Sequence, residues 1–219
     1  MKNREKDPFN WDSITIEMYY EIMDILNEEG DDDLTKNVKL VSVILEKDEQ
    51  EIWDMELSEV GRYVSKLSFL EKFDIPSHPN MKVNLPGFDL EVMKDVTKIN
   101  VAQYIDYQNF VRLPLRESID KILSIFLIPK GHKYNEGYDI IELQTAIRQY
   151  MSFRIAEGLL GFFLKQYGRS LIRSLASYRR SIRKTKDPHM KEEMEMIQTE
   201  LKKKLDDLIH LTGYSSSTK

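Results

Sequence analysis

Histidine is the side chain best suited to proton transfer or metal binding near neutral pH. The four histidines of this chain, His78, His132, His189 and His210, stand in different segments, and no two have the HExxH or i,i+4 spacing of helical metal sites. The chain has no cysteine, which excludes disulfides, thiolate metal sites and cysteine nucleophiles. We therefore expect solvated or structural histidines, with no catalytic residue, no metal site and no cofactor.

Other catalytic patterns are also missing from the sequence. The acidic run EEGDDD at residues 28–33 lacks the spaced oxygen ligands of a calcium loop, so it indicates a solvated turn, with a surface for a basic partner as the alternative. The glycines stand singly and build neither a phosphate-binding loop nor a dinucleotide fingerprint. No serine lies in a nucleophile elbow. These patterns favour a protein that is not an enzyme.

The strongest charge pattern is a stretch from Gly158 to Lys186 that contains no acidic residue. A basic stripe of this kind can neutralise phosphates without reading sequence, because each contact releases condensed counterions. It can equally pair with an acidic protein surface, either on the last helix or on another subunit. The candidate residues for contact with nucleic acid or an acidic partner are Lys165, Arg169, Arg173, Arg179, Arg180, Arg183, Lys184 and Lys186.

A second candidate surface lies in the last predicted helix. Asp187 followed by Pro188 predicts its start, because the aspartate can cap the helix and the proline already has helical φ. Apolar residues then recur every three or four positions, as in a short coiled coil. This seam packs either on the preceding helix or on another chain, and methionines suit an adaptable surface. Its candidate residues are Met190, Met194, Ile197, Leu201, Leu205 and Leu208.

The composition indicates a soluble globular protein of 219 residues, with 41% apolar and 32% charged residues and a net charge of −5. The longest apolar run, LLGFFL at 159–164, is far shorter than the roughly 20 residues of a membrane span. We expect a buried helix there, and no membrane contact. The absence of cysteine suits a reducing cytoplasm.

Periodicity and capping signals position these stretches on helices. Helices are predicted at about 15–28, 35–46, 58–73, 100–111 and 187–211, with others starting at Pro114 and Asp139. Thr15, Asp48 and Asp139 are predicted N-caps, and Gly168 is a candidate break in the helical stretch that follows Asp139. Around Pro86-Gly87 the weakly alternating segment predicts a β-hairpin.

The predicted fold is mainly α, with two related helical modules linked by a small β-hairpin and followed by a C-terminal helical hairpin. The stretches ITIEMYYEIMDI at 14–25 and INVAQYIDYQNF at 99–110 share a cap-and-staple helix start, and LVSVIL and ILSIFL follow them in the same order. A degenerate duplication and the ordinary similarity of amphipathic helices both explain this echo. The predicted segments are an N-terminal helical module (1–75), a hairpin linker (76–99), a second helical module ending in the basic helix (100–186), a terminal amphipathic helix (187–212) and a flexible tail (213–219).

The order of these motifs resembles tail-assembly-chaperone-like proteins of tailed bacteriophages. The first half carries the resemblance in WDSITIEMYYEI, KLVSVIL and DEQEIWDMELSEV, and FLIPKGHKY in the second half is similar to proteins of crAss-like gut phages. The resemblance implies a non-enzymatic protein acting through protein contacts in tail or neck assembly, in the host cytoplasm. The basic segment and the terminal helix depart from that pattern, so a minor structural or packaged virion protein is the alternative. The implied partners are other phage structural proteins, with a second copy of the chain and DNA as further candidates.

Overall fold

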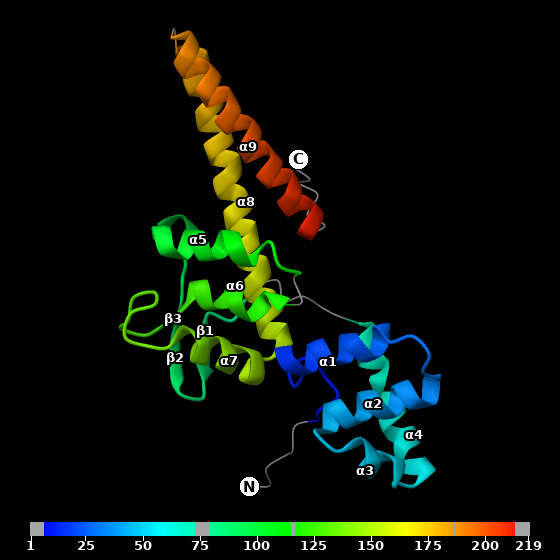
Figure 1. Ribbon diagram of the computed structural model, residues 1–219. Helices are drawn as coiled ribbons and strands as arrows, with labels where there is room; N and C mark the ends of the chain where they lie inside the picture. Colours follow the sequence, from blue (N-terminus) through cyan, green and yellow to red (C-terminus); the bar gives the residue numbers. More distant parts are fainter. Residues whose placement is uncertain (1–6, 73–78, 115–116, 186, 213–219) are drawn as a thin grey trace. The chain divides into compact units, whose positions relative to one another are not determined.

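The computed structural model describes residues 7–72, 79–114, 117–185 and 187–212. The chain is mainly helical, as predicted, and carries a small antiparallel sheet (Figure 1). It divides into two compact units, which are residues 1–93 with 101–159, and residues 94–100 with 160–219. The division into five segments stays a prediction, and the predicted flexible tail lies outside the described residues.

The N-terminal part consists of short helices with polar caps. Thr15 Oγ1 accepts a hydrogen bond from Met18 N at 3.2 Å, and Asp48 Oδ1 accepts one from Gln50 N at 2.8 Å, which confirms both predicted caps. Asp32 caps the second helix through Thr35 N at 2.8 Å, so that helix begins earlier than predicted. The elements are α1 (Ile16–Asn27), α2 (Asp33–Leu45), α3 (Glu49–Trp53), α4 (Leu57–Lys66) and the 3₁₀ turn η1 (Leu67–Glu71).

The acidic turn between α1 and α2 holds a lysine. Lys39 Nζ lies 2.6 Å from Asp31 Oδ2 and 2.9 Å from Glu28 Oε2. The hydrogen bond with Asp31, followed by the one with Glu28, raises the pKa of Lys39. With Asp32 capping α2, three acidic residues of the run have a structural role in the turn.

The predicted hairpin is present and belongs to a three-stranded sheet, β1 (Lys82–Leu85), β2 (Phe88–Val92) and β3 (Leu127–Pro129). Leu85 pairs with Phe88 across the Pro86-Gly87 turn, where Gly87 has a φ of 80°, a conformation that glycine adopts readily. The third strand was not predicted. It pairs Leu127 with Val92 and Pro129 with Leu90.

The second half is built from longer helices. The helix predicted at Pro114 begins only at Ile119, and the predicted break at Gly168 is wrong, because one helix continues through that glycine. The break lies instead at Met151 and Ser152. The elements are the 3₁₀ turn η2 (Val96–Lys98), α5 (Val101–Phe110), α6 (Ile119–Phe126), α7 (Ile140–Tyr150), α8 (Phe153–Lys184) and α9 (Pro188–Thr212).

The break between α7 and α8 is fixed by the start of the chain. Ile16 N donates to Met151 O at 3.2 Å and Phe153 N donates to Ile14 O at 2.7 Å, forming an antiparallel bridge. These backbone groups would otherwise continue the helical ladder, so the bridge ends α7 and starts α8.

An aromatic cluster surrounds this bridge. The rings of Tyr19 and Phe153 stack with centroids 3.6 Å apart and planes 12° apart. Trp11 lies against both, and its Nε1 donates to Phe69 O at 3.1 Å. The segment before α1 is thereby tied to α8 and to η1. The large non-aromatic side chains that are less than 2% exposed include Ile14, Ile16, Ile22, Ile52, Leu123, Ile125, Leu127, Leu143, Ile147, Met151 and Leu159.

A buried polar group interrupts this apolar interior. Asp120 at the start of α6 is 5% exposed, and among the described residues its Oδ1 has no hydrogen-bond partner. Burial raises the pKa of the Asp120 carboxyl, while the nearby charge of Arg148 opposes the rise. Arg148 also lies 5.0 Å from the ring centroid of Tyr20. Asp120 is therefore harder to ionise in the folded chain than in water.

The LLGFFL run lies in α8, as a buried helical segment. Leu159, Leu160 and Phe163 are at most 2% exposed, which confirms the prediction. In the part of the chain that the structure describes, no helix combines the length and the apolar character needed to cross a membrane.

Candidate partner-binding surfaces

The predicted basic stripe lies on α8, from Lys165 to the C-terminal end of the helix at Lys184. Seven of its eight residues are exposed, and Lys186 lies outside the described residues. Because each residue turns an α-helix by 100°, the seven side chains fall within a sector of about 140° around the helix axis. They extend over about 29 Å along that axis. We call this surface the basic face, made up of Lys165, Arg169, Arg173, Arg179, Arg180, Arg183 and Lys184.

The positive charges of the basic face form no ion pairs within 4.0 Å with the side chains that the structure describes. Arg173 does interact with Asp95, whose pKa is held low mainly by hydrogen bonds from Thr97, with a smaller contribution from Arg173. The basic face is therefore available to a polyanion or to an acidic protein.

Apolar residues of α8 mostly point elsewhere. Leu171 and Leu175 are 5% and 7% exposed and lie on the side of the helix opposite to the basic face. Ile172 is different, because it falls inside the basic sector and is 48% exposed. The basic face therefore has an apolar side chain between its charges.

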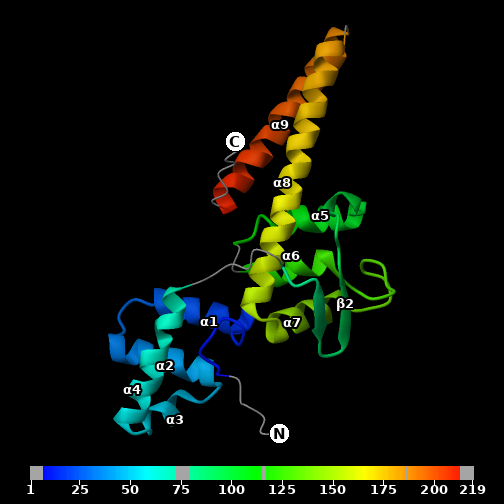
Figure 2. The same ribbon diagram turned by 180° about the vertical axis from the view of Figure 1, so that it is seen from behind.

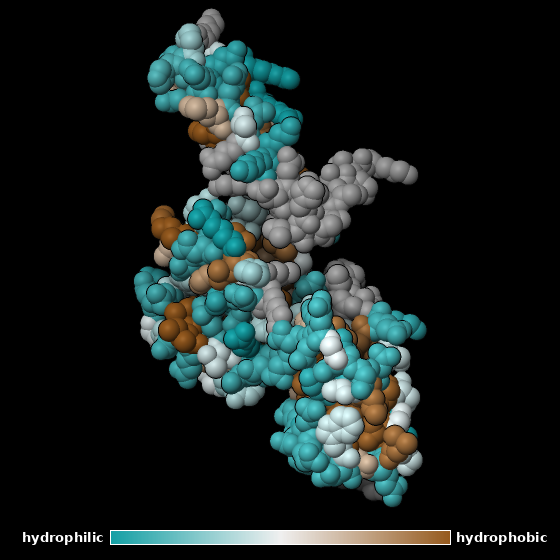
Figure 3. All heavy atoms as spheres, turned by 45° about the vertical axis from the view of Figure 1, so that its right-hand side comes forward, coloured by the Kyte–Doolittle hydropathy of each residue, from teal (hydrophilic) through white to brown (hydrophobic). Residues whose placement is uncertain are grey.

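The predicted seam lies on α9, which starts at Pro188 as expected, with Asp187 Oδ1 accepting from His189 N at 3.0 Å. Figures 1 and 2 show α9 running back beside α8 from the turn that joins them. Met190 is 49% and Ile197 40% exposed, so these two residues of the seam are only partly covered. Figure 3 shows hydrophobic residues among hydrophilic ones in this region. Met194 is half-buried, and the side chains of Leu201, Leu205 and Leu208 lie outside the described residues.

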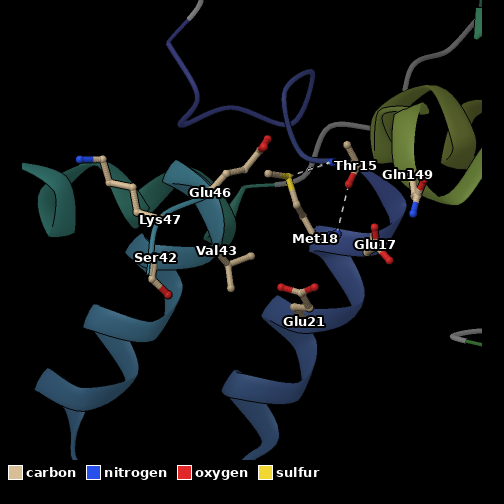
Figure 4. A pocket seen from close by; sticks show the side chains of 9 residues that line it. All are labelled: Thr15, Glu17, Met18, Glu21, Ser42, Val43, Glu46, Lys47 and Gln149. Carbon is tan, nitrogen blue, oxygen red and sulfur yellow. Dashed lines mark hydrogen bonds between the residues drawn. The ribbon is translucent and has the colours of Figure 1, made fainter. Parts of the chain in front are cut away.

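A third surface was not predicted from the sequence. A hollow of about 360 Å³ lies where α1, the end of α2 and the end of α7 meet (Figure 4). Three carboxylates, those of Glu17, Glu21 and Glu46, line it, and Met18 and Val43 provide apolar surface between them. We call it the acidic groove; its remaining lining residues are Thr15, Ser42, Lys47 and Gln149.

The carboxylates of the acidic groove repel one another. Partial burial raises the pKa of Glu21, and the charges of Glu17 and Asp24 raise it further. Lys47 offers little compensation, because its Nζ lies 3.9 Å from Glu51 and points away from the groove in Figure 4. The groove is thus a site that favours a cation.

A spacing signal for this groove was present in the sequence. Glu17, Glu21, Asp24 and Glu28 follow one another at intervals of four, three and four residues, which places them on one side of a helix. The contribution of Glu46 could not be foreseen. It ends α2 in the left-handed conformation, with a φ of 51°, and this turn brings it beside α1.

Each of the two histidines whose side chains are described has its own neighbour. His132 lies edge-on to Tyr138 at 6.0 Å, and His189 Nδ1 is 3.6 Å from Glu193 Oε1 on α9. His78 and the side chain of His210 lie outside the described residues. No group of three His, Cys, Asp or Glu residues that could hold a metal ion occurs among the described side chains.

Comparison of the chain with protein-family models, curated proteins and solved structures gives no match.

Proposed function

We propose that this chain is a non-enzymatic bacteriophage protein that acts through protein–protein contacts during assembly of the virion tail or neck. The observation that carries the proposal is the partly exposed apolar seam of α9, where Met190 and Ile197 are 49% and 40% exposed. Apolar side chains in this helical pattern gain stability by packing against a partner helix. The proposal places the protein in the host cytoplasm during assembly, with phage structural proteins as partners.

The bacteriophage setting rests on the motif resemblance of WDSITIEMYYEI and FLIPKGHKY. In this proposal the helix pairs α1–α2 and α5–α6 derive from a degenerate duplication. Each pair packs together, and the similar segments LVSVIL and ILSIFL lie in α2 and, apart from Leu127, in α6. Such a duplication would give the protein two similar helix pairs.

A complementation experiment tests the proposal. A phage with a stop codon in this gene should form few complete particles, and supplying the chain in trans should restore them. Met190→Gln should restore particles poorly, whereas Met196→Gln should restore them fully. The two variants make the same chemical change on α9, but Met196 is 62% exposed on a different side of the helix. Parental particle yield without the chain would refute the proposal.

Mass spectrometry of purified particles separates the two roles that the proposal allows. A transient chaperone should be missing from finished particles, whereas a structural or packaged component should be present in constant amount per particle. Either result is compatible with contacts during assembly, and the second favours a lasting place in the virion.

DNA contact is the second candidate function, and the basic face favours it. Seven exposed cations along about 29 Å of helix can follow a phosphate backbone without reading bases. Binding to random duplex DNA should weaken with salt, and Arg179→Ala/Arg180→Ala/Arg183→Ala should reduce the slope of log K against log salt by about 3. Absent or salt-insensitive binding would rule this function out.

A further inference from the structure

Charge is strongly segregated along this chain. Residues 7–72 carry 18 acidic and 6 basic side chains, a net charge of −12, whereas residues 158–186 carry 8 basic and no acidic ones. The overall charge of −5 conceals this division. Oppositely charged surfaces of this size attract one another between molecules, with a range set by the Debye length of about 10 Å at 0.1 M salt.

The acidic groove and the basic face also match in their apolar parts. In the groove, Met18 and Val43 lie between the carboxylates (Figure 4). On the basic face, Ile172 lies between the cations and is 48% exposed. An incoming helix with this pattern can place its apolar side chain against Met18 and Val43 while its arginines meet the carboxylates. Arginine suits these contacts because its guanidinium forms paired hydrogen bonds with carboxylates.

The spacing of the charges agrees as well. On α1, Glu17 and Glu21 are four residues apart, and on α8 Arg169 and Arg173 have the same spacing. Each pair spans about 6 Å of helix. Two α-helices with the same repeat can keep their charged rows in register along a contact of this length.

We propose that the acidic groove of one copy binds the basic face of α8 of a second copy. This inference rests on the proposed function in one respect, because it names a second copy as one of the protein partners. The two surfaces are different, so the contact is heterologous. Each copy keeps one unfilled groove and one unfilled basic face, and association continues until a ring closes or an open chain grows.

The test combines two variants of the full chain. The groove variant is Glu17→Lys/Glu21→Lys, and the face variant is Arg169→Ala/Arg173→Ala. A control, Asp54→Lys/Glu56→Lys, makes the same charge change at exposed positions outside the groove. Masses are measured by sedimentation velocity at about 0.05 M and about 1 M salt, and circular dichroism checks that each variant is folded.

The parent should form species larger than one chain at low salt and dissociate at high salt. Each variant alone should lose self-association by at least tenfold, and the control should keep it. Mixing the two variants should give a complex of one copy each and nothing larger, because only one intact groove and one intact basic face remain.

A parent that stays monomeric at every concentration would overturn the inference, as would a control that behaves like the groove variant. A mixture that forms no complex would overturn it too. A salt-sensitive conformational change without a change in mass would show that the two surfaces meet within one chain, which also overturns it. These outcomes leave the complementation experiment untouched, so failure here is distinguishable from failure of the proposed function.

Discussion

Replacing Phe153 by alanine should strongly destabilise the unit formed by residues 1–93 and 101–159. The Phe153 side chain is 5% exposed. Its ring centroid lies 3.6 Å from that of Tyr19, on which it stacks, and 5.7 Å from that of Trp11. Loss of a buried phenylalanine costs about 3–5 kcal/mol through lost burial and the cavity left behind. That is a large part of the roughly 5–15 kcal/mol that stabilises a typical domain. The expected fall in melting temperature is about 6–20 °C.

The aromatic stack itself is measured by a double-mutant cycle. Tyr19→Leu, Phe153→Leu and the combination keep apolar volume and remove the ring contact. A coupling free energy of about 0.5–1.5 kcal/mol is expected.

Urea unfolding followed by tryptophan fluorescence is a direct assay for these variants. Trp11 lies in the cluster, and Trp53→Phe leaves it as the single reporter, because the chain has two tryptophans and Trp53 is 43% exposed. Phe162→Ala, on the same helix at a half-buried position, is the control and should cost less. A cost below about 1 kcal/mol for Phe153→Ala would refute the view that this cluster joins α1 to α8.

Asp120→Asn should be more stable than the parent at pH 7 but not at pH 4 in urea titrations. The pKa of Asp120 is higher in the folded chain than its ordinary value of 3.8, because burial disfavours the charged carboxylate. The protonated carboxyl therefore does not destabilise the fold below pH 3.8, and the fold loses stability as the pH rises through the raised pKa and the carboxyl ionises. Gly137→Ala should lower the melting temperature, because φ is 79° and a Cβ would lie 2.6 Å from His132 Nδ1, whereas Gly61→Ala in α4 should raise stability by about 0.5–1 kcal/mol. Asp139→Ala should cost about 1 kcal/mol and Asp139→Ser much less, since Asp139 accepts from the first amides of α7; equal losses would contradict this.

Local signals predicted the helix starts well, because a cap is a short-range interaction. Thr15, Asp48, Asp139 and Asp187 cap helices as expected from their side chains alone. The elements that were missed depend on partners far away in the sequence. The strand β3 exists because β2 lies beside it, and the α7–α8 break exists because residues 14–16 occupy the backbone groups there.

The candidate surfaces divide in the same way. The basic face needed only helical spacing and the absence of acidic residues, and both are visible in the sequence. The acidic groove needed the packing of α1 against α2 and α7, together with the left-handed residue Glu46, which no periodicity predicts. Its acidic row on α1 was visible in the sequence, but its apolar floor was not.

The bridge that joins residues 14–16 to the start of α8 also constrains the order in which the protein can form. Asp12 and Arg154, which pair next to the bridge at 3.3 Å, are 142 residues apart in the chain. At synthesis rates of roughly 5–20 residues per second, the ribosome needs on the order of ten seconds to make the intervening chain. Throughout that interval Ile14 and Tyr19 lack the residues that later cover them. During translation the apolar residues of α1 therefore stay partly exposed until Met151 and Phe153 have been synthesised.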